Sequence, residues 1–345
     1  MLKKIVITLI VILVSLGFYY RDLVSYGWMQ AKGQVTMLLN VRDVADVLND
    51  PTFPDSLKSR IRLIEEIKQF GVDSLGLNPS ENYTTFYDQQ DKPLMWVMTA
   101  SDRHQIKAYK WKFPIIGTFP YKGYFDSTRA VTEEKELIKA GLDTDMGEAS
   151  AWSTLGYLKD PILSSMLKRR EGSLANLILH ELTHGTLFVK NNLELNENLA
   201  SFIGDHGAIR FLTQKYGANS KELRTYEFSK NYNDAYSQHM LRGISKLDSL
   251  YADFVLCKTD SIAMDTLKKQ VILKILNDAD TLFANKITLK TQSRWNDKNL
   301  PNNAYFISYQ TYKSKQNLFR HEFETKFGGN FKKYLSYLKQ KYPSL

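Results

Sequence analysis

The chain has 345 residues, of which 43% are hydrophobic and 24% are charged. These fractions are typical of globular proteins and exclude a disordered tail, a collagen-like fibre or a polytopic membrane protein as the main body. The formal net charge of +9 is spread along the chain without a basic run, so nucleic acid is not expected as a partner. The single cysteine, Cys257, excludes an intramolecular disulfide and a zinc site made only of thiolates.

The N-terminal segment begins with Lys3 and Lys4, followed by an apolar run over residues 5–20. As a helix this run would span about 24 Å, slightly less than a hydrocarbon core of about 30 Å. The run ends in a poor signal-peptidase site, so an uncleaved anchor is favoured over a cleaved signal peptide. We therefore expect an N-terminal transmembrane helix within residues 1–21, and a single-pass protein of the cell membrane whose remaining part faces the periplasm or exterior.

The rest of the chain, residues 22–345, is expected to form one domain with three parts. Apolar residues recur at helical spacing in 22–93, whereas 94–160 holds short β-like runs broken by Pro and Gly, with one amphipathic helix over 127–141. The stretch 149–158 reads as a further strand, and 161–345 is helical almost to its end. This order predicts an α+β fold, predominantly helical, with a small sheet beside it.

Two histidines form the candidate metal-binding motif. Residues 180–184 read His-Glu-Leu-Thr-His, and positions four apart on a helix share one face, so His180 and His184 can bind one metal ion. Glu181 is then placed to reach a water on that metal. Ser173 is the candidate N-cap of this helix, and the leucines that follow supply its buried face.

A catalytic zinc site needs a third protein ligand and an open position. Glu197 follows within a second helix that runs to about Tyr216, and it is favoured over Glu194, which is expected in the connecting loop. Two turns further, Asp205 could orient a histidine ligand or be a solvated charge. His206 could be a further ligand or a hydrogen-bond donor to the transition state.

Several motifs in order carry a resemblance to a known family. His180–His184 followed by LNENLA resembles the gluzincin zinc peptidases. More closely, WKFPIIGTFPYKGYF, ASAWSTLGYLKDPILSSMLKR, LILHELTHGTLFVKNNLELNENLASFIGDHG and LPNNAYFISYQTY resemble the bacterial putative aminopeptidase family, over roughly residues 25–342. The resemblance implies a gluzincin-like fold, one Zn²⁺ per chain on His180, His184 and Glu197, Glu181 as catalytic base, and a peptide or protein substrate.

Further residues are candidates for contacts with the substrate and the transition state. A side-chain donor should complete the stabilisation of the oxyanion, and Tyr312 is favoured over Tyr309 and His206. The expected strand at 149–154 could hold the substrate backbone, and Glu148 could pair with a free α-amine.

The function expected is therefore that of a zinc metallopeptidase, an aminopeptidase at the outer face of the cytoplasmic membrane. The alternatives are a membrane-anchored endopeptidase and a non-catalytic anchored binding protein. Glu181 argues against the last, because a structural zinc site needs no adjacent base and usually has four protein ligands.

Overall fold

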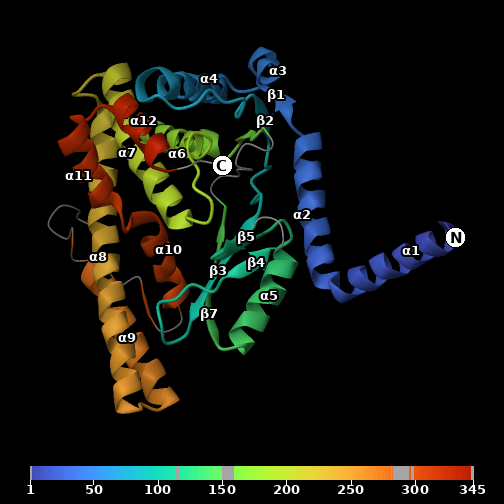
Figure 1. Ribbon diagram of the computed structural model, residues 1–345. Coiled ribbons are helices and arrows are strands. Elements are labelled where there is room, and N and C mark those ends of the chain that lie inside the picture. Colours follow the sequence, from blue (N-terminus) through green and yellow to red (C-terminus); the bar gives the residue numbers. More distant parts are fainter. Residues whose placement is uncertain are drawn as a thin grey trace.

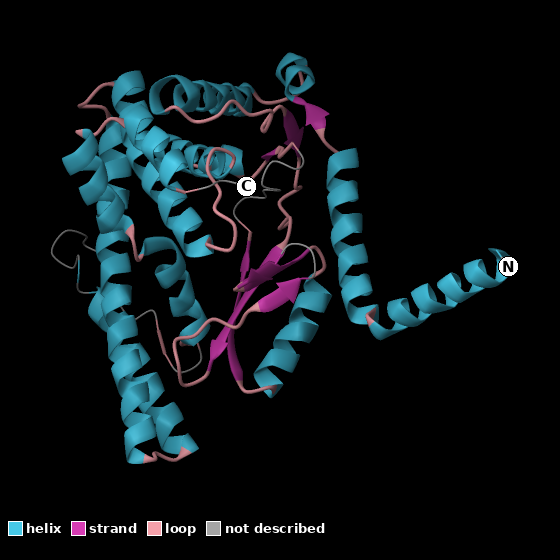
Figure 2. Ribbon diagram, viewed as in Figure 1, coloured by secondary structure: helices cyan, strands magenta, loops and turns pink. Residues whose placement is uncertain are grey.

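The computed structural model describes residues 2–113, 117–149, 159–280 and 299–342, together with residues 282, 295 and 296. Within them the fold is a mostly helical α+β arrangement with small sheets (Figures 1 and 2). The α-helices are α1 Leu2–Tyr19, α2 Arg21–Leu39, α3 Val44–Asn49, α4 Asp55–Phe70, α5 Ser127–Lys139, α6 Glu171–His184, α7 Leu193–Tyr216, α8 Lys221–Cys257, α9 Ser261–Asp280, α10 Asn303–Lys313, α11 Gln316–Phe327 and α12 Phe331–Lys341.

The main hydrophobic core lies between α4, α6, α7, α11 and α12. Leu174, Ile178 and Leu182 of α6 are buried, at the four-residue spacing that places them on one face. Phe202 of α7 packs edge-on against Phe323 of α11, with ring centroids 5.4 Å apart. The two helices α6 and α7 therefore lie in the most closely packed part of the molecule.

In the part of the chain that the structure describes, three small sheets accompany the helices. The strands are β1 Arg42–Asp43, β2 Thr85–Tyr87, β3 Trp96–Asp102, β4 Trp111–Phe113, β5 Gly117–Phe119, β6 Tyr121–Tyr124, β7 Leu142–Glu148 and β8 Ile162–Leu163. β3 is central in an antiparallel sheet of order β6-β3-β7, while β1-β2-β8 form a second sheet and β4-β5 a hairpin. No strand was expected at β7, because its sequence LDTDMGE is acidic and holds only two apolar residues, Leu142 and Met146.

A second core fixes α10 beside the sheet. It is formed by α8, α9 and α10, and Phe306 of α10 is fully buried in it. Asn303 begins α10, is also fully buried, and its side-chain amide donates to the main-chain oxygen of Asp102 at 3.0 Å. The N-terminal end of α10 is thus held against the end of β3, and its other end runs toward α7.

The N-terminal helices correct one expectation. α2 packs on the central sheet, where the Tyr26 hydroxyl donates to the Gly123 oxygen at 2.8 Å, and α1 extends away from the body (Figure 1). Among the residues that the structure describes, no helix is both long and apolar enough to cross a membrane. The predicted transmembrane helix and single-pass membrane location are therefore wrong, in keeping with an apolar run that falls short of the hydrocarbon thickness.

One helix boundary differs from expectation. α6 begins at Glu171 rather than after Ser173, and the Glu171 carboxylate accepts a hydrogen bond from Arg60 at 2.7 Å. An acidic residue in the first turn suits the positive end of the helix dipole. The strand expected over 149–158 falls, except for Ala149, outside the described residues.

Candidate metal centre

Helices α6 and α7 bring three metal-ligating side chains together. The Nε2 atom of His180 lies 3.2 Å from that of His184, and the Glu197 Oε2 atom lies 3.3 Å from the first and 3.6 Å from the second. One ligand atom from each residue therefore lies within 4.8 Å of the others. Together, His180, His184 and Glu197 could hold a metal ion.

The separations suit a small tetrahedral site. Ligand atoms at about 2.0–2.1 Å from a tetrahedral ion lie about 3.3–3.4 Å from one another. The three measured separations, 3.2, 3.3 and 3.6 Å, bracket this value. The His184 Nδ1 atom is buried and has no hydrogen-bond partner among the described residues. The polar contacts of this ring are therefore made by its Nε2 atom.

The cluster is buried and electrostatically coupled. His184 and Glu197 are only 8% and 7% exposed. Burial alone would raise the pKa of the Glu197 carboxyl, but hydrogen bonds from His180 and His184 outweigh it and lower that pKa to about 2. Burial alone would lower the pKa of His184, but the hydrogen bond to Glu197 and the charge of Glu197 outweigh burial and raise that pKa. Glu197 is therefore a carboxylate at neutral pH.

Hydrogen bonds between polar side chains hold α6 against α7, one helical turn from the metal cluster. The Asn176 side chain of α6 donates to the Asp205 carboxylate of α7 at 2.9 Å, and the Tyr226 hydroxyl of α8 donates to the same oxygen at 2.9 Å. Asp205, considered from the sequence as a carboxylate that orients a histidine, instead joins three helices.

The charge of Glu181, the residue after His180, acts on three tyrosines. Burial raises the pKa of Tyr312 well above its usual value, and the charges of Glu197 and Glu181 add to this. The same three causes raise the pKa of Tyr121 on β6, with burial again the largest. Burial and then Glu181 raise that of Tyr83, whose hydroxyl has no hydrogen-bond partner among the described residues. All three hydroxyls stay protonated at neutral pH.

Tyr121 and Tyr83 were not found from the sequence. Tyr121 comes from the aromatic stretch before α5, far from the histidines in the chain, and only the fold places it near Glu197. Tyr83 has a positive φ of 66°. A bulky residue in that region is uncommon and is a signal of a constrained site, but the sequence does not reveal it.

The remaining candidates lie elsewhere. The Tyr309 hydroxyl lies 2.9 Å from that of Tyr305, in the core between α8 and α10. His206 packs on Phe202, with ring centroids 4.5 Å apart, and lines a small separate cavity. Glu148 ends β7 and lines another cavity. Glu194 belongs to the first turn of α7 rather than to a loop, and its carboxylate accepts from Ser314 at 2.8 Å.

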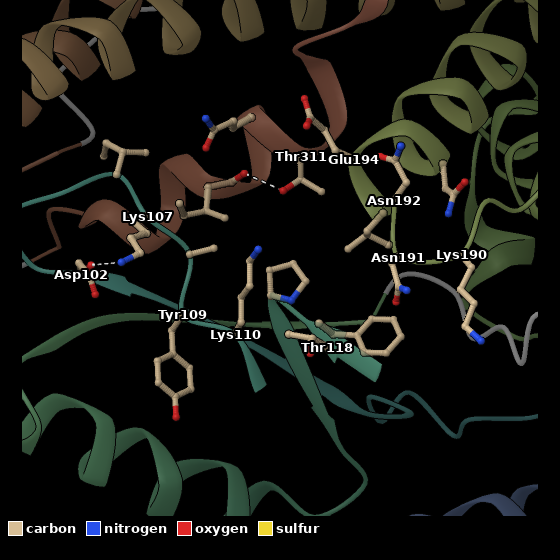
Figure 3. Close-up of a pocket in the computed structure, with 18 of the residues that line it drawn as sticks. Asp102, Lys107, Tyr109, Lys110, Thr118, Lys190, Asn191, Asn192, Glu194 and Thr311 are labelled. Carbon is tan, nitrogen blue, oxygen red and sulfur yellow. Dashed lines mark hydrogen bonds and ion pairs between the residues drawn. The ribbon is translucent and has the colours of Figure 1, made fainter. Parts of the chain in front are cut away.

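A cavity of about 1170 Å³ is lined by α10, by the start of α7 and by residues 106–110 (Figure 3). Its wall includes Phe188, Asn196, Thr311 and Pro120, each close in the chain to a residue of the site. Phe188 also packs edge-on against His184, with ring centroids 6.0 Å apart. The volume exceeds the roughly 300–1,000 Å³ usual for small-ligand pockets.

The fold and site define a mostly helical α+β protein with a buried cluster that could hold a metal ion. The model of a family described as putative aminopeptidase matches residues 25–341, and the chain belongs to this family. No curated protein and no solved structure matches it. Membership suggests peptidase activity and a peptide substrate, as the sequence predicted.

Proposed function

We propose that the protein is a zinc-dependent peptidase of the gluzincin type that releases N-terminal residues from peptides. The observation that carries this proposal is the convergence of His180, His184 and Glu197 at separations that suit a tetrahedral ion. Two imidazoles and one carboxylate are a donor set of catalytic zinc sites, in which the fourth position stays open. Family membership supports the peptidase activity and the aminopeptidase assignment.

The residues divide into ligands, a base and a donor. Zinc held by the three ligands would polarise a substrate carbonyl and lower the pKa of a bound water toward about 7. Glu181 is assigned as the general base, which takes a proton from the attacking water and returns it to the leaving amine. Its place beside the first ligand on α6 supports this role.

Tyr312 is assigned as the hydrogen-bond donor to the oxyanion. Its hydroxyl is protonated at neutral pH, because burial and the nearby carboxylate of Glu197 raise its pKa. A donor that is fixed by the fold stabilises developing negative charge without rearrangement during the reaction. Tyr121 lies in the same electrostatic environment and is a second donor available to the substrate.

The test is peptide cleavage by the zinc-loaded full chain and by its Glu181→Gln variant. We expect cleavage of a peptide with a free α-amine, a loss of about 10²–10⁴-fold in kcat for the variant, and the same zinc content in both. An N-acetylated copy of the peptide should not be cut. Equal cleavage of the two peptides would identify an endopeptidase, and an unchanged Glu181→Gln variant would remove the assigned base.

A further inference from the structure

The cavity beside the metal cluster has an unbalanced positive charge. Its wall holds two carboxylates that already have basic partners: Asp102 lies 3.8 Å from Lys107, and Glu194 lies 3.5 Å from Lys315. Lys110 and Lys190 line the same cavity, and neither forms an ion pair with any residue that the structure describes. In Figure 3 the Lys110 side chain extends into the space between its own segment and α10.

The backbone that carries Lys110 is firmly held. The Tyr109 amide donates to the Ala100 oxygen of β3 at 2.8 Å, and the Tyr109 ring packs edge-on against Trp111, with centroids 4.9 Å apart. Lys110 thus extends from a segment that is fixed on both sides. A charge on a fixed backbone loses less conformational freedom when it binds a partner.

Hydrogen bonds from side chains of α7 hold the loop that carries Lys190. The Asn196 side chain accepts from the Val189 amide at 2.8 Å and donates to the Val189 oxygen at 3.0 Å. Asn192 caps α7 by accepting from the Leu195 amide at 3.2 Å. Lys190 therefore lies on a loop tied to the helix that supplies Glu197.

We propose that this cavity binds the part of a peptide substrate away from the scissile bond and selects a carboxylate there through Lys110 and Lys190. The proposal rests on the proposed peptidase function and names its substrate class: peptides with an acidic side chain or a free C-terminal carboxylate. Phe188 lines the cavity and packs against the ligand His184, so a chain cut at the cluster can extend into the cavity. The bound peptide places its carboxylate against one of these two ammonium groups.

The test measures peptide binding rather than cleavage. Zinc-loaded Glu181→Gln full chain, expected not to cut the peptides, is titrated calorimetrically with three short peptides of matched sequence and free α-amine. One carries a glutamate and an amidated C-terminus, one a glutamine and an amidated C-terminus, and one a glutamine and a free C-terminus. The same series is repeated with Lys110→Gln, with Lys190→Gln, and with Lys112→Gln, an exposed lysine of β4 outside the cavity wall.

We expect at least one carboxylate-bearing peptide to bind about two- to fivefold more tightly than the neutral one at low salt, with the difference shrinking in high salt. Lys110→Gln or Lys190→Gln should remove most of this difference, and Lys112→Gln should keep it. The peptide that binds best distinguishes a side-chain from a C-terminal carboxylate.

Equal binding of all three peptides, no binding of any, or a preference that survives both cavity substitutions would overturn the proposal. Cleavage of the neutral peptide by the wild-type protein separates this result from a failure of the peptidase function. If the wild type cuts the neutral peptide while carboxylates give no advantage, only the selectivity is wrong.

Discussion

Gly204 of α7 lies so close to Asn176 of α6 that a β-carbon at Gly204 would be 2.8 Å from the Asn176 main-chain oxygen. The same β-carbon would lie 3.3 Å from the Cβ of His180. The first distance is below any ordinary contact, so only glycine permits this approach of the two backbones. The approach in turn lets Glu197, two turns earlier on α7, reach both histidines.

Gly204→Ala is therefore expected to force α6 and α7 apart. Overpacking of this kind costs about 1–3 kcal/mol in the free energy of unfolding, and the displaced Glu197 should weaken zinc binding. Denaturant unfolding and a zinc titration measure the two effects. Gly27→Ala on the exposed face of α2, where a β-carbon meets nothing within 4 Å, is the control and should be neutral or slightly stabilising. A Gly204→Ala variant as stable as this control would contradict the argument.

Asn198 couples the metal ligands to Tyr312. Its buried side chain donates to the Thr311 oxygen at 2.7 Å and accepts from the Lys315 amide at 2.8 Å. Asn198→Ala leaves these buried groups unpaired, which should cost about 1–3 kcal/mol of stability. It should also lower kcat more than it raises KM, while zinc content stays unchanged. Asn330→Ala, which removes the N-cap of α12, should lose stability without loss of kcat.

Tyr312→Phe tests the donor directly. Removal of one oxyanion donor lowers kcat by about 10²-fold, with little change in KM. Tyr309→Phe removes a hydroxyl from the same helix that contacts Tyr305 instead of the site, and it should leave kcat unchanged. Steady-state kinetics on one peptide compares the two variants. Equal kcat values for Tyr312→Phe and wild type would rule out the assignment.

His206 gives the protein an acid-sensitive stability. Burial, and next the charges of Lys230 and Arg320, lower the pKa of His206 to about 4. An unfolded histidine titrates near 6.5, so between about 6.5 and 4 the unfolded state binds more protons than the folded state, and stability falls as pH falls. From pH 7 to pH 5 the wild type should lose about 1–2 kcal/mol more than His206→Gln. Equal losses in the wild type and in His206→Gln, measured by denaturant unfolding at the two pH values, would contradict the prediction.

Much of the fold and the central cluster could be predicted from the sequence. The spacing of His180 and His184 is a local property of a helix, and the fold brings Glu197 of α7 to them. Likewise, α5 forms where its apolar spacing indicates. These features depend on residues close in the chain, for which periodicity is informative.

Features that depend on distant contacts could not be predicted. Tyr121 and Tyr83 join the site through a sheet and a strained backbone, neither of which leaves a spacing pattern. β7 forms because it pairs with β3 along its full length, despite an acidic sequence. The transmembrane helix expected from the N-terminal composition was wrong, because no helix among the described residues is long and apolar enough to cross a membrane.

The most direct measurement is the zinc content of the purified full chain, of Glu197→Ala and of Glu194→Ala. Glu194 is the matched control, since it lies one turn earlier on α7 and contacts Ser314 rather than the histidines. The account predicts one zinc per chain in the wild type and in Glu194→Ala, and loss of zinc in Glu197→Ala. A wild type without metal, or a Glu197→Ala variant that retains zinc at the wild-type level, would contradict it.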